Sequence, residues 1–197
     1  SPPRMKAARG LAPSLRHGLP PPPTLQLPPA PPPPPPAAAA ADDSLPLNHV
    51  VHLGAALNET ASLSDGSTVH RLAVRGPPGC AWLSARLEAL ALRPGERLFV
   101  HGERGVGAQG AWTAESLRRT GRSAVEGGAR AGTLVTPPLP GSLLVIELHS
   151  PAAAAAAAPR PPPVLASIVA GTAPIFGTAA LEARDADAYS APAADES

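Results

Sequence analysis

The sequence has few aromatic residues and one cysteine, and it lacks any long apolar run. Aromatics make up 3% of its 197 residues, and Cys80 is the single cysteine. One cysteine excludes an internal disulfide and argues against a thiolate metal site, so Cys80 is expected to be a small apolar residue in a strand. No apolar stretch reaches the roughly 20 residues of a membrane-spanning helix, so we expect no membrane insertion.

The sequence also lacks a concentration of charge of one sign. Its formal net charge is +1, and basic residues are mixed with acidic ones. The nearest approach to a basic patch is Arg118, Arg119, Arg122 and Arg130, which Glu126 interrupts and no aromatic residue interleaves. A nucleic-acid-binding surface needs a basic stripe or patch, so we interpret this stretch as a solvated loop and expect no nucleic-acid partner.

Proline and glycine are abundant instead, with 29 and 18 residues. Fifteen of the prolines precede Asp42. Residues 1–41 are therefore predicted to be a disordered Pro/Ala-rich segment that supplies no core. The predicted domain spans residues 42–178, which is long enough to bury a core, with a low-complexity loop at 152–163. Residues 179–197 are predicted to form a disordered acidic and alanine-rich tail.

Two proline tracts lie in the N-terminal segment, Pro20–Pro23 and Pro31–Pro36. The proline ring fixes φ and removes the amide donor, which favours polyproline II. We interpret the tracts first as stiff spacers. The alternative is that they are ligands for a proline-tract-binding domain.

The region after Leu45 carries short apolar runs separated by Gly/Pro turns. Ala81–Leu87 alternates apolar and polar residues, as a half-buried strand does, although a helix over 81–92 is a rival interpretation. Leu143–Leu148 is apolar on both faces apart from Glu147, which predicts a central strand. Further strands are expected at 48–53, 69–74, 98–101 and 164–169. About seven short strands without intervening helices predict an all-β fold, a small antiparallel β-sandwich.

The run Gly105–Gly110 spells the glycine spacing of dinucleotide-binding folds. In those folds the first glycine ends a buried strand and the following helix packs on a parallel sheet. Here Glu103 and Arg104 separate the strand from the glycines, and the segment Ala114–Arg119 is short. We therefore interpret the run as a hairpin tip and expect no nucleotide or other cofactor.

Residue types that could form a catalytic triad are present, but their pattern does not favour catalysis. No serine lies in a Gly-x-Ser-x-Gly elbow. His49 and His52 lie three residues apart on a predicted strand, which places them on opposite faces and disfavours metal binding. His101 and His149 end predicted strands and are expected to face solvent. We assign no catalytic, cofactor-binding or metal-binding residue, and we expect this chain not to be an enzyme.

One candidate modification site remains. Asn58-Glu59-Thr60 is an N-glycosylation sequon with a non-proline centre, so Asn58 is a possible glycan acceptor. The motif has meaning only if the chain enters the secretory pathway.

Several turn and strand motifs between Thr68 and Val169 resemble a known family. They are Arg93–Gly95, Leu98–Val100, Gly110–Ala114, Leu134–Pro137 and Val145–Leu148. Their order is similar to that in the non-catalytic β-sandwich region which precedes the protease domain of bacterial lysyl-endopeptidase-like, trypsin-fold serine endopeptidases. The chain departs from that pattern by a longer insertion between Glu115 and Ala131, and no cysteines follow Gly171–Phe176.

The resemblance implies an accessory or pro-region module in the secretory pathway or secreted. It implies a protease domain as partner, in cis or in trans, on which the module packs or which it positions. The parent protein would then be a serine endopeptidase, while this chain contributes no catalytic residue. Two alternatives stay open: a scaffold protein whose proline tracts dock a partner, and a nucleotide-binding enzyme.

Overall fold

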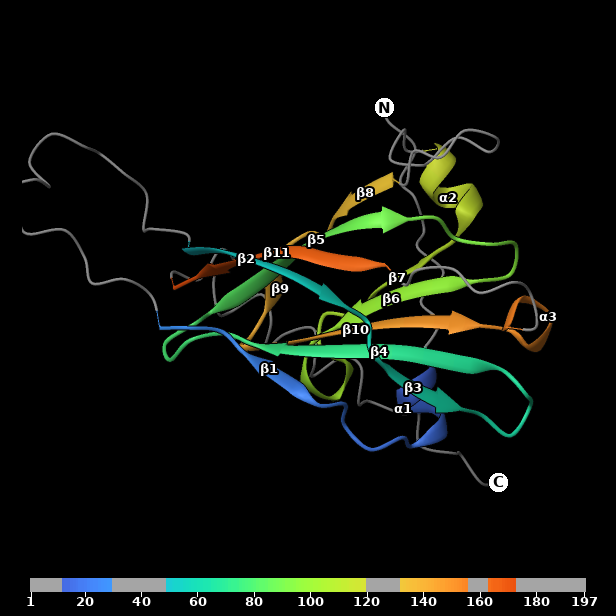
Figure 1. Ribbon diagram of the computed structural model, residues 1–197. Helices are drawn as coiled ribbons and strands as arrows, with labels where there is room; N and C mark the ends of the chain where they lie inside the picture. The colour runs from blue at the N-terminus through green and yellow to red at the C-terminus, as the bar shows by residue number, and fades with distance from the viewer. Residues whose placement is uncertain (1–11, 30–48, 120–131, 156–162, 173–197) are drawn as a thin grey trace, which may run out of the picture.

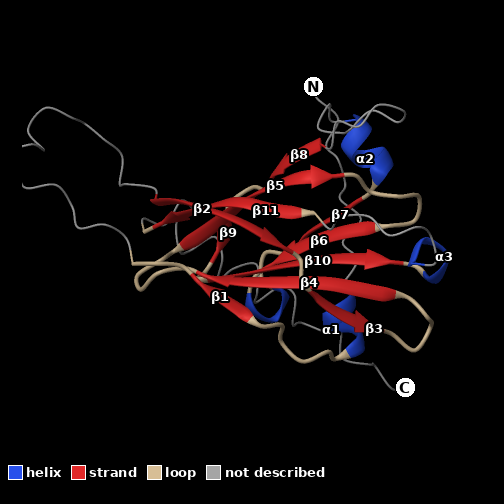
Figure 2. Cartoon of the chain, in the orientation of Figure 1, coloured by secondary structure: helices blue, strands red, loops and turns tan. Residues whose placement is uncertain are grey.

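The computed structural model describes residues 12–29, 49–119, 132–155 and 163–172, and these residues form two β-sheets packed face to face (Figure 1). Strands dominate, and the helices are short and lie at the periphery (Figure 2). The predicted all-β, largely antiparallel sandwich is confirmed. The Pro31–Pro36 tract, most of the predicted loop 152–163 and the predicted tail 179–197 lie outside the described residues.

Sheet A contains six strands in the order β1-β4-β10-β6-β7, with β3 also paired to β4. Strand β1 runs parallel to β4, and the other pairings are antiparallel. The strands are β1 (Thr24–Gln26), β3 (Glu59–Ser62), β4 (Thr68–Arg75), β6 (Arg97–His101), β7 (Gln109–Trp112) and β10 (Leu143–Ser150). The prediction of a central strand at 143–148 is confirmed, since β10 lies between β4 and β6.

Sheet B contains five antiparallel strands in the order β2-β11-β5-β8, with β9 paired to the other end of β5. Its strands are β2 (His49–Ala56), β5 (Trp82–Leu90), β8 (Gly132–Val135), β9 (Leu139–Pro140) and β11 (Val164–Gly171). The chain passes from sheet B to sheet A between β2 and β3, and it returns to sheet B between β4 and β5 (Figure 1).

Four short helical segments complete the described chain. They are α1 (Pro13–His17), the 3-10 turn η2 (Glu103–Gly105), α2 (Ala114–Arg119) and α3 (Ala152–Ala155). Within the described residues, no helix is long and apolar enough to cross a membrane.

Strand β5 settles the choice between strand and helix at 81–92. Its Leu83, Ala85 and Leu87 point into the core, while Arg86 on the opposite face is exposed. Ser84, on the same face as Arg86, is buried, and its hydroxyl donates to the Thr136 carbonyl at 2.7 Å. The Ala85 amide donates to the Thr136 hydroxyl at 2.9 Å, which ties the chain after β8 to β5.

The core lies between the two sheets and consists mainly of leucines. Sheet A contributes alternate residues such as Leu144, Ile146 and Leu148, all at most 2% exposed. Sheet B contributes Leu83, Leu87, Leu165 and Ile168. Because each strand alternates its side chains, aliphatic residues at every second position fill most of this interior, and Trp112 packs against it.

Cys80 was expected to lie in a strand, but it lies in the connection between β4 and β5. Its thiol donates to the Trp82 carbonyl at 3.1 Å, and burial raises the pKa of the Cys80 thiol. A Cβ added to Gly76 would lie 2.7 Å from the Cys80 sulfur, so the connection is tight enough to require glycine there.

The prediction that residues 1–41 supply no core is wrong for residues 12–29. Strand β1 extends sheet A, and Leu27 is 2% exposed and belongs to the core cluster. Ala12 is 1% exposed, and Pro22 is also buried. The proline-rich composition led to the wrong prediction for this segment. Polyproline geometry is close to that of an extended chain, so such a segment can also lie along a sheet.

We expect Leu27→Ala to lower the free energy of unfolding by about 2–4 kcal/mol, because it removes a buried side chain and leaves a cavity. The matched control is Leu25→Ala, two residues away in β1, where the side chain is 37% exposed. Urea denaturation of both variants measures the difference. Equal stabilities of the two variants would contradict the placement of residues 12–29 in the fold.

Candidate functional site

The outer face of sheet A, which is turned away from the core, carries buried charged side chains. On β10, Glu147 points to this face, since its neighbours Ile146 and Leu148 point inward. Its cross-strand partners are Arg71 on β4 and Phe99 on β6. Arg71 is 1% exposed and Glu147 is fully buried, so two opposite charges lie side by side beneath a covering layer.

Residues 12–27 form that covering layer, which we call the N-terminal strap. It begins with α1, continues through the Pro20–Pro23 tract and ends as β1 along the edge of β4. In Figure 1, α1 and β1 lie on the sheet A side of the sandwich, beside β3 and β4. The strap explains why polar groups on an outer sheet face are buried.

Glu147 is held by the start of the strap and by β6. The Ser14 amide donates to Oε2 of Glu147 at 3.1 Å, and the Ser14 hydroxyl donates to Oε1. Nε2 of His101 lies 3.2 Å from the same Oε1. Burial acts to raise the pKa of Glu147, but the hydrogen bonds from His101 and Ser14 favour the carboxylate, and the pKa is lowered. The carboxylate is therefore stabilised as an anion inside the protein.

His101 was expected to face solvent, and this expectation is wrong: the residue is 3% exposed. Its Nδ1 lies 2.8 Å from the Gly102 carbonyl, and its Nε2 faces Glu147. Both ring nitrogens thus face oxygen atoms of neighbouring groups. The strap covers this end of β6, which the local sequence around His101 does not reveal.

Arg71 connects three segments of the chain. Its Nη1 donates to the Pro20 carbonyl at 2.7 Å, and its Nη2 pairs with Oε1 of Glu59 on β3 at 2.5 Å. A guanidinium has five donors in a fixed plane, so it can hold the strap and β3 at the same time. Sequence reasoning singled out neither Arg71 nor Ser14, although both contact buried charged or main-chain groups of this layer.

Ser14, His101 and Glu147 have the residue types of a hydrolytic triad but not its order. In a triad the histidine lies between the serine and the acid, so that it can remove the hydroxyl proton. Here the carboxylate lies between the other two, because Ser14 and His101 both contact Oε1 of Glu147. The arrangement binds the strap, and the hydroxyl of Ser14 donates to the carboxylate and not to the histidine as in a triad.

A second buried carboxylate, Glu96, has a structural role. Its Oε1 accepts from the Ser150 hydroxyl at 3.0 Å, and its Oε2 accepts from the Arg93 amide at 2.7 Å. The turn at Pro94–Gly95 is thereby attached to the end of β10.

The glycine run Gly105–Gly110 connects β6 to β7, two antiparallel neighbours in sheet A. The predicted hairpin tip is confirmed. Gly105 has a φ of 85°, and a Cβ added there would lie 2.7 Å from Leu15 of the strap. The absence of a side chain at Gly105 therefore allows the hairpin and the strap to lie close together.

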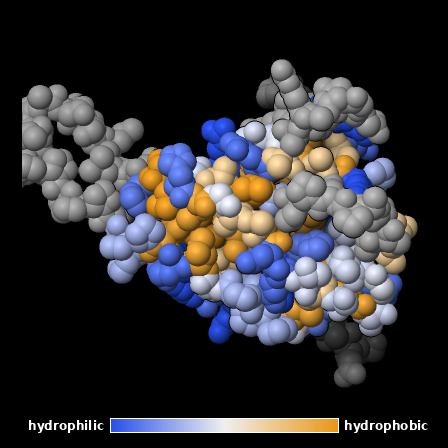
Figure 3. All heavy atoms as spheres, in the orientation of Figure 1, coloured by the Kyte–Doolittle hydropathy of each residue, from blue (hydrophilic) through white to orange (hydrophobic). Residues whose placement is uncertain are grey.

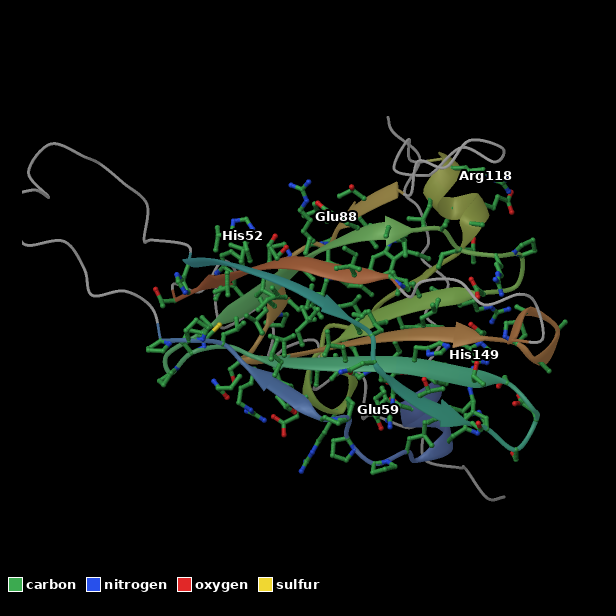
Figure 4. The ribbon with its side chains drawn as sticks, in the orientation of Figure 1. His52, Glu59, Glu88, Arg118 and His149 are labelled. Atoms are coloured by element: carbon green, nitrogen blue, oxygen red, sulfur yellow. The ribbon has the colours of Figure 1, made fainter. Side chains whose placement is uncertain are left out.

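The other polar residues considered from the sequence are dispersed. His49 is half-buried and His52 is exposed, both on β2. Figure 4 shows His52, Glu88 and Arg118 on the sheet B side, apart from Glu59 and His149 on the sheet A side. Arg122 and Arg130 lie outside the described residues. Within the described part of the chain, no group of three or more His, Cys, Asp or Glu side chains is placed to hold a metal ion.

Asn58 lies exposed in the short link between β2 and β3. Thr60, the third residue of the sequon, is also exposed, and its hydroxyl is hydrogen-bonded to Nδ1 of His70 at 2.9 Å. Glycosylation at Asn58 stays a prediction, and the side chain is accessible for it.

The lowered pKa of Glu147 makes stability depend on pH in a defined window. The unfolded carboxyl binds a proton near its ordinary pKa of 4.5, whereas the folded one resists protonation to lower pH. We therefore expect the free energy of unfolding to fall as the pH drops below about 4.5 and onward through the folded pKa. Glu147→Gln removes this titration and should make the decline shallower in urea denaturation between pH 7 and 3.

Two further variants separate Glu147 from other groups. Burial lowers the pKa of His149 from its ordinary 6.5, so this residue makes the free energy of unfolding fall as the pH drops below about 6.5 and through the folded pKa. His149→Gln should alter only that part of the curve. Glu88→Gln changes an exposed carboxylate of sheet B and serves as the control. Parallel acid curves for Glu147→Gln and the wild type would contradict the role given to Glu147.

Comparison of the chain with protein families, curated proteins and solved structures finds no match. Function is therefore inferred from the residue pattern and from the geometry of the two outer sheet faces.

Proposed function

We propose that this chain is a non-catalytic β-sandwich module that packs on, or positions, a trypsin-fold serine endopeptidase domain. The proposal combines the resemblance of the segment 68–169 to an accessory region with a feature of the surface. It assigns the module a role in binding and no reaction of its own.

The outer face of sheet B is the observation that carries the proposal. Val50 on β2 and Val135 on β8 are each 50% exposed, at the two edges of this face. Val169 on β11, the cross-strand partner of Val50, is half-buried between them. In Figure 3 apolar residues gather over the region in which Figure 1 places β2. Among the described residues, the strap lies over the outer face of sheet A, whereas no described segment covers Val50 and Val135 on the face of sheet B, which supports that face as the site for a partner.

The family-like motifs support a structural role for this region. Leu98–Val100 lies in β6 and Val145–Leu148 in β10, which are hydrogen-bonded neighbours. Gly110–Ala114 includes the end of β7, and Leu134 of β8 is fully buried. Motifs that build strands and turns are what a packing module shares with its relatives, whereas an enzyme also needs a reactive group with a base in reach.

The alternative function, partner docking through the proline tracts, is less well supported for the first tract. Pro22 is buried, and the Pro20 carbonyl accepts a hydrogen bond from Arg71. A partner that takes Pro20–Pro23 would have to displace these contacts. The tract Pro31–Pro36 therefore carries that alternative.

We expect a lysyl-endopeptidase-type protease domain to bind the chain, with the outer face of sheet B in the interface. The double variant Val50→Lys/Val135→Lys should weaken binding roughly tenfold or more, because it places charges in an apolar contact. Val106→Lys, which changes an exposed valine near η2, is the matched control. Calorimetric titration measures each affinity. Unchanged affinity in the double variant, or no binding by the wild type, would contradict the proposal.

The coding sequence beyond Ser197 provides an independent check. A following domain with its own catalytic His, Asp and Ser would place the partner in cis. A following sequence of another class would favour the scaffold alternative.

The proposed secretory localisation is tested at Asn58. When the chain is directed into a eukaryotic secretory pathway, we expect a glycan-sized mass increase that a glycosidase removes and that Asn58→Gln abolishes. Asn48→Gln, which changes an asparagine outside any sequon, is the control. A wild-type chain without added mass would argue against use of the sequon.

A further inference from the structure

We propose that the outer face of sheet A is a peptide-binding site and that the N-terminal strap is its resident ligand, held in cis. The ligand class is an extended, proline-containing peptide with a hydroxyl residue near its amino end. Such a peptide, supplied in trans, can occupy the site when the strap is displaced.

The site holds the strap largely through its main chain. Arg71 donates to the Pro20 carbonyl, and Glu147 accepts from the Ser14 amide. At the other end, the Leu27 amide donates to the Arg75 carbonyl at 2.9 Å, and β1 adds to β4 as a parallel strand. Contacts of this kind are typical of sites that bind extended peptides by strand addition, where the main chain supplies affinity and a few side chains supply specificity.

Specificity comes from side chains of the strap that contact the domain, among them Gln26, whose amide donates to the Gly76 carbonyl at 3.1 Å. The Ser14 hydroxyl reaches Glu147, and the Leu27 side chain enters the core cluster. By contrast, Arg16 and His17 of α1 are exposed. The charged groups that make the contacts, Arg71 and Glu147, thus belong to the domain, and the strap offers them a main-chain carbonyl, a main-chain amide and a hydroxyl.

The edge of β4 is divided between two strands, which defines the extent of the site. Strand β3 pairs with residues 68–71, whereas β1 pairs with residues 73–75. Strand β3 follows β2 after a two-residue link, so it is fixed to the sandwich. Strand β1, by contrast, is separated along the sequence from β2 by residues 27–48. The carboxyl-terminal part of the β4 edge is therefore the part that an exchangeable strand can occupy.

The tether keeps the site occupied in the intact chain. Attachment through the same chain gives the strap an effective concentration on the order of millimolar, so a peptide in trans competes poorly. Cleavage of the link converts the contact into an ordinary bimolecular equilibrium without changing any contact residue.

The test uses the full chain with a site-specific protease sequence inserted between residues 34 and 45. After folding and cleavage, the strap fragment is allowed to exchange with a fluorescent peptide of residues 12–29, and anisotropy reports binding. We expect saturable binding of this peptide. Peptides with Ser14→Ala and with Leu27→Ala should bind roughly fivefold and at least roughly thirtyfold more weakly, respectively, and a peptide with Arg16→Gln should bind as the wild type does.

Changes made in the peptide leave the domain unaltered, so weaker binding cannot come from misfolding. On the domain side, Glu147→Gln should weaken binding about tenfold, whereas Arg86→Gln on the outer face of sheet B should have no effect. Equal binding of the Ser14→Ala, Leu27→Ala and wild-type peptides would overturn the proposal. So would a strap fragment that stays on the cleaved protein without exchanging, since it would then be a permanent part of the fold.

Discussion

Two opposite charges buried side by side on an outer sheet face impose the main constraint on this fold. Arg71 and Glu147 are cross-strand partners, at 1% and 0% exposure. A buried ion costs several kcal/mol unless hydrogen bonds replace its hydration. The N-terminal strap supplies part of those bonds through Ser14 and Pro20, and His101 and Glu59 supply others, although Nε of Arg71 is buried without a hydrogen-bond partner among the described residues. The strap and the charged pair therefore depend on each other, and the outer layer of sheet A follows from that dependence.

The sheets could be predicted from the sequence because their signals are local. Alternation in β5 and the apolar run of β10, with Gly/Pro turns at their ends, identify strands without any knowledge of partners. The strap could not be predicted this way. Its proline content indicates disorder, and the groups that bind it lie far along the chain, 133 residues from Ser14 to Glu147 and 51 from Pro20 to Arg71. The burial of His101 was missed for the same reason. The one local signal of this buried polar layer was Glu147, a glutamate in an otherwise apolar strand.

The two outer faces differ, and the functional proposals follow from that difference. The face of sheet A is covered by the chain itself, through contacts directed mainly at peptide groups. The face of sheet B exposes Val50 and Val135 and has an exposed ion pair between Arg86 and Glu88. A module with one closed and one open face fits a role in packing against a larger partner. The interior between the sheets is filled mainly by aliphatic side chains from alternating strand positions, which is why the fold needs few aromatic residues.

Amide hydrogen exchange on the intact chain tests the central claim most directly. If the strap is hydrogen-bonded to the two buried charged residues, the amides of Ser14 and Leu27 are protected, because they donate to Glu147 and to the Arg75 carbonyl. Their exchange should be slowed by orders of magnitude relative to an unstructured peptide, and Glu147→Gln should release Ser14 first. Exchange of both amides at the rate of an unstructured peptide, with β10 still protected, would contradict the account.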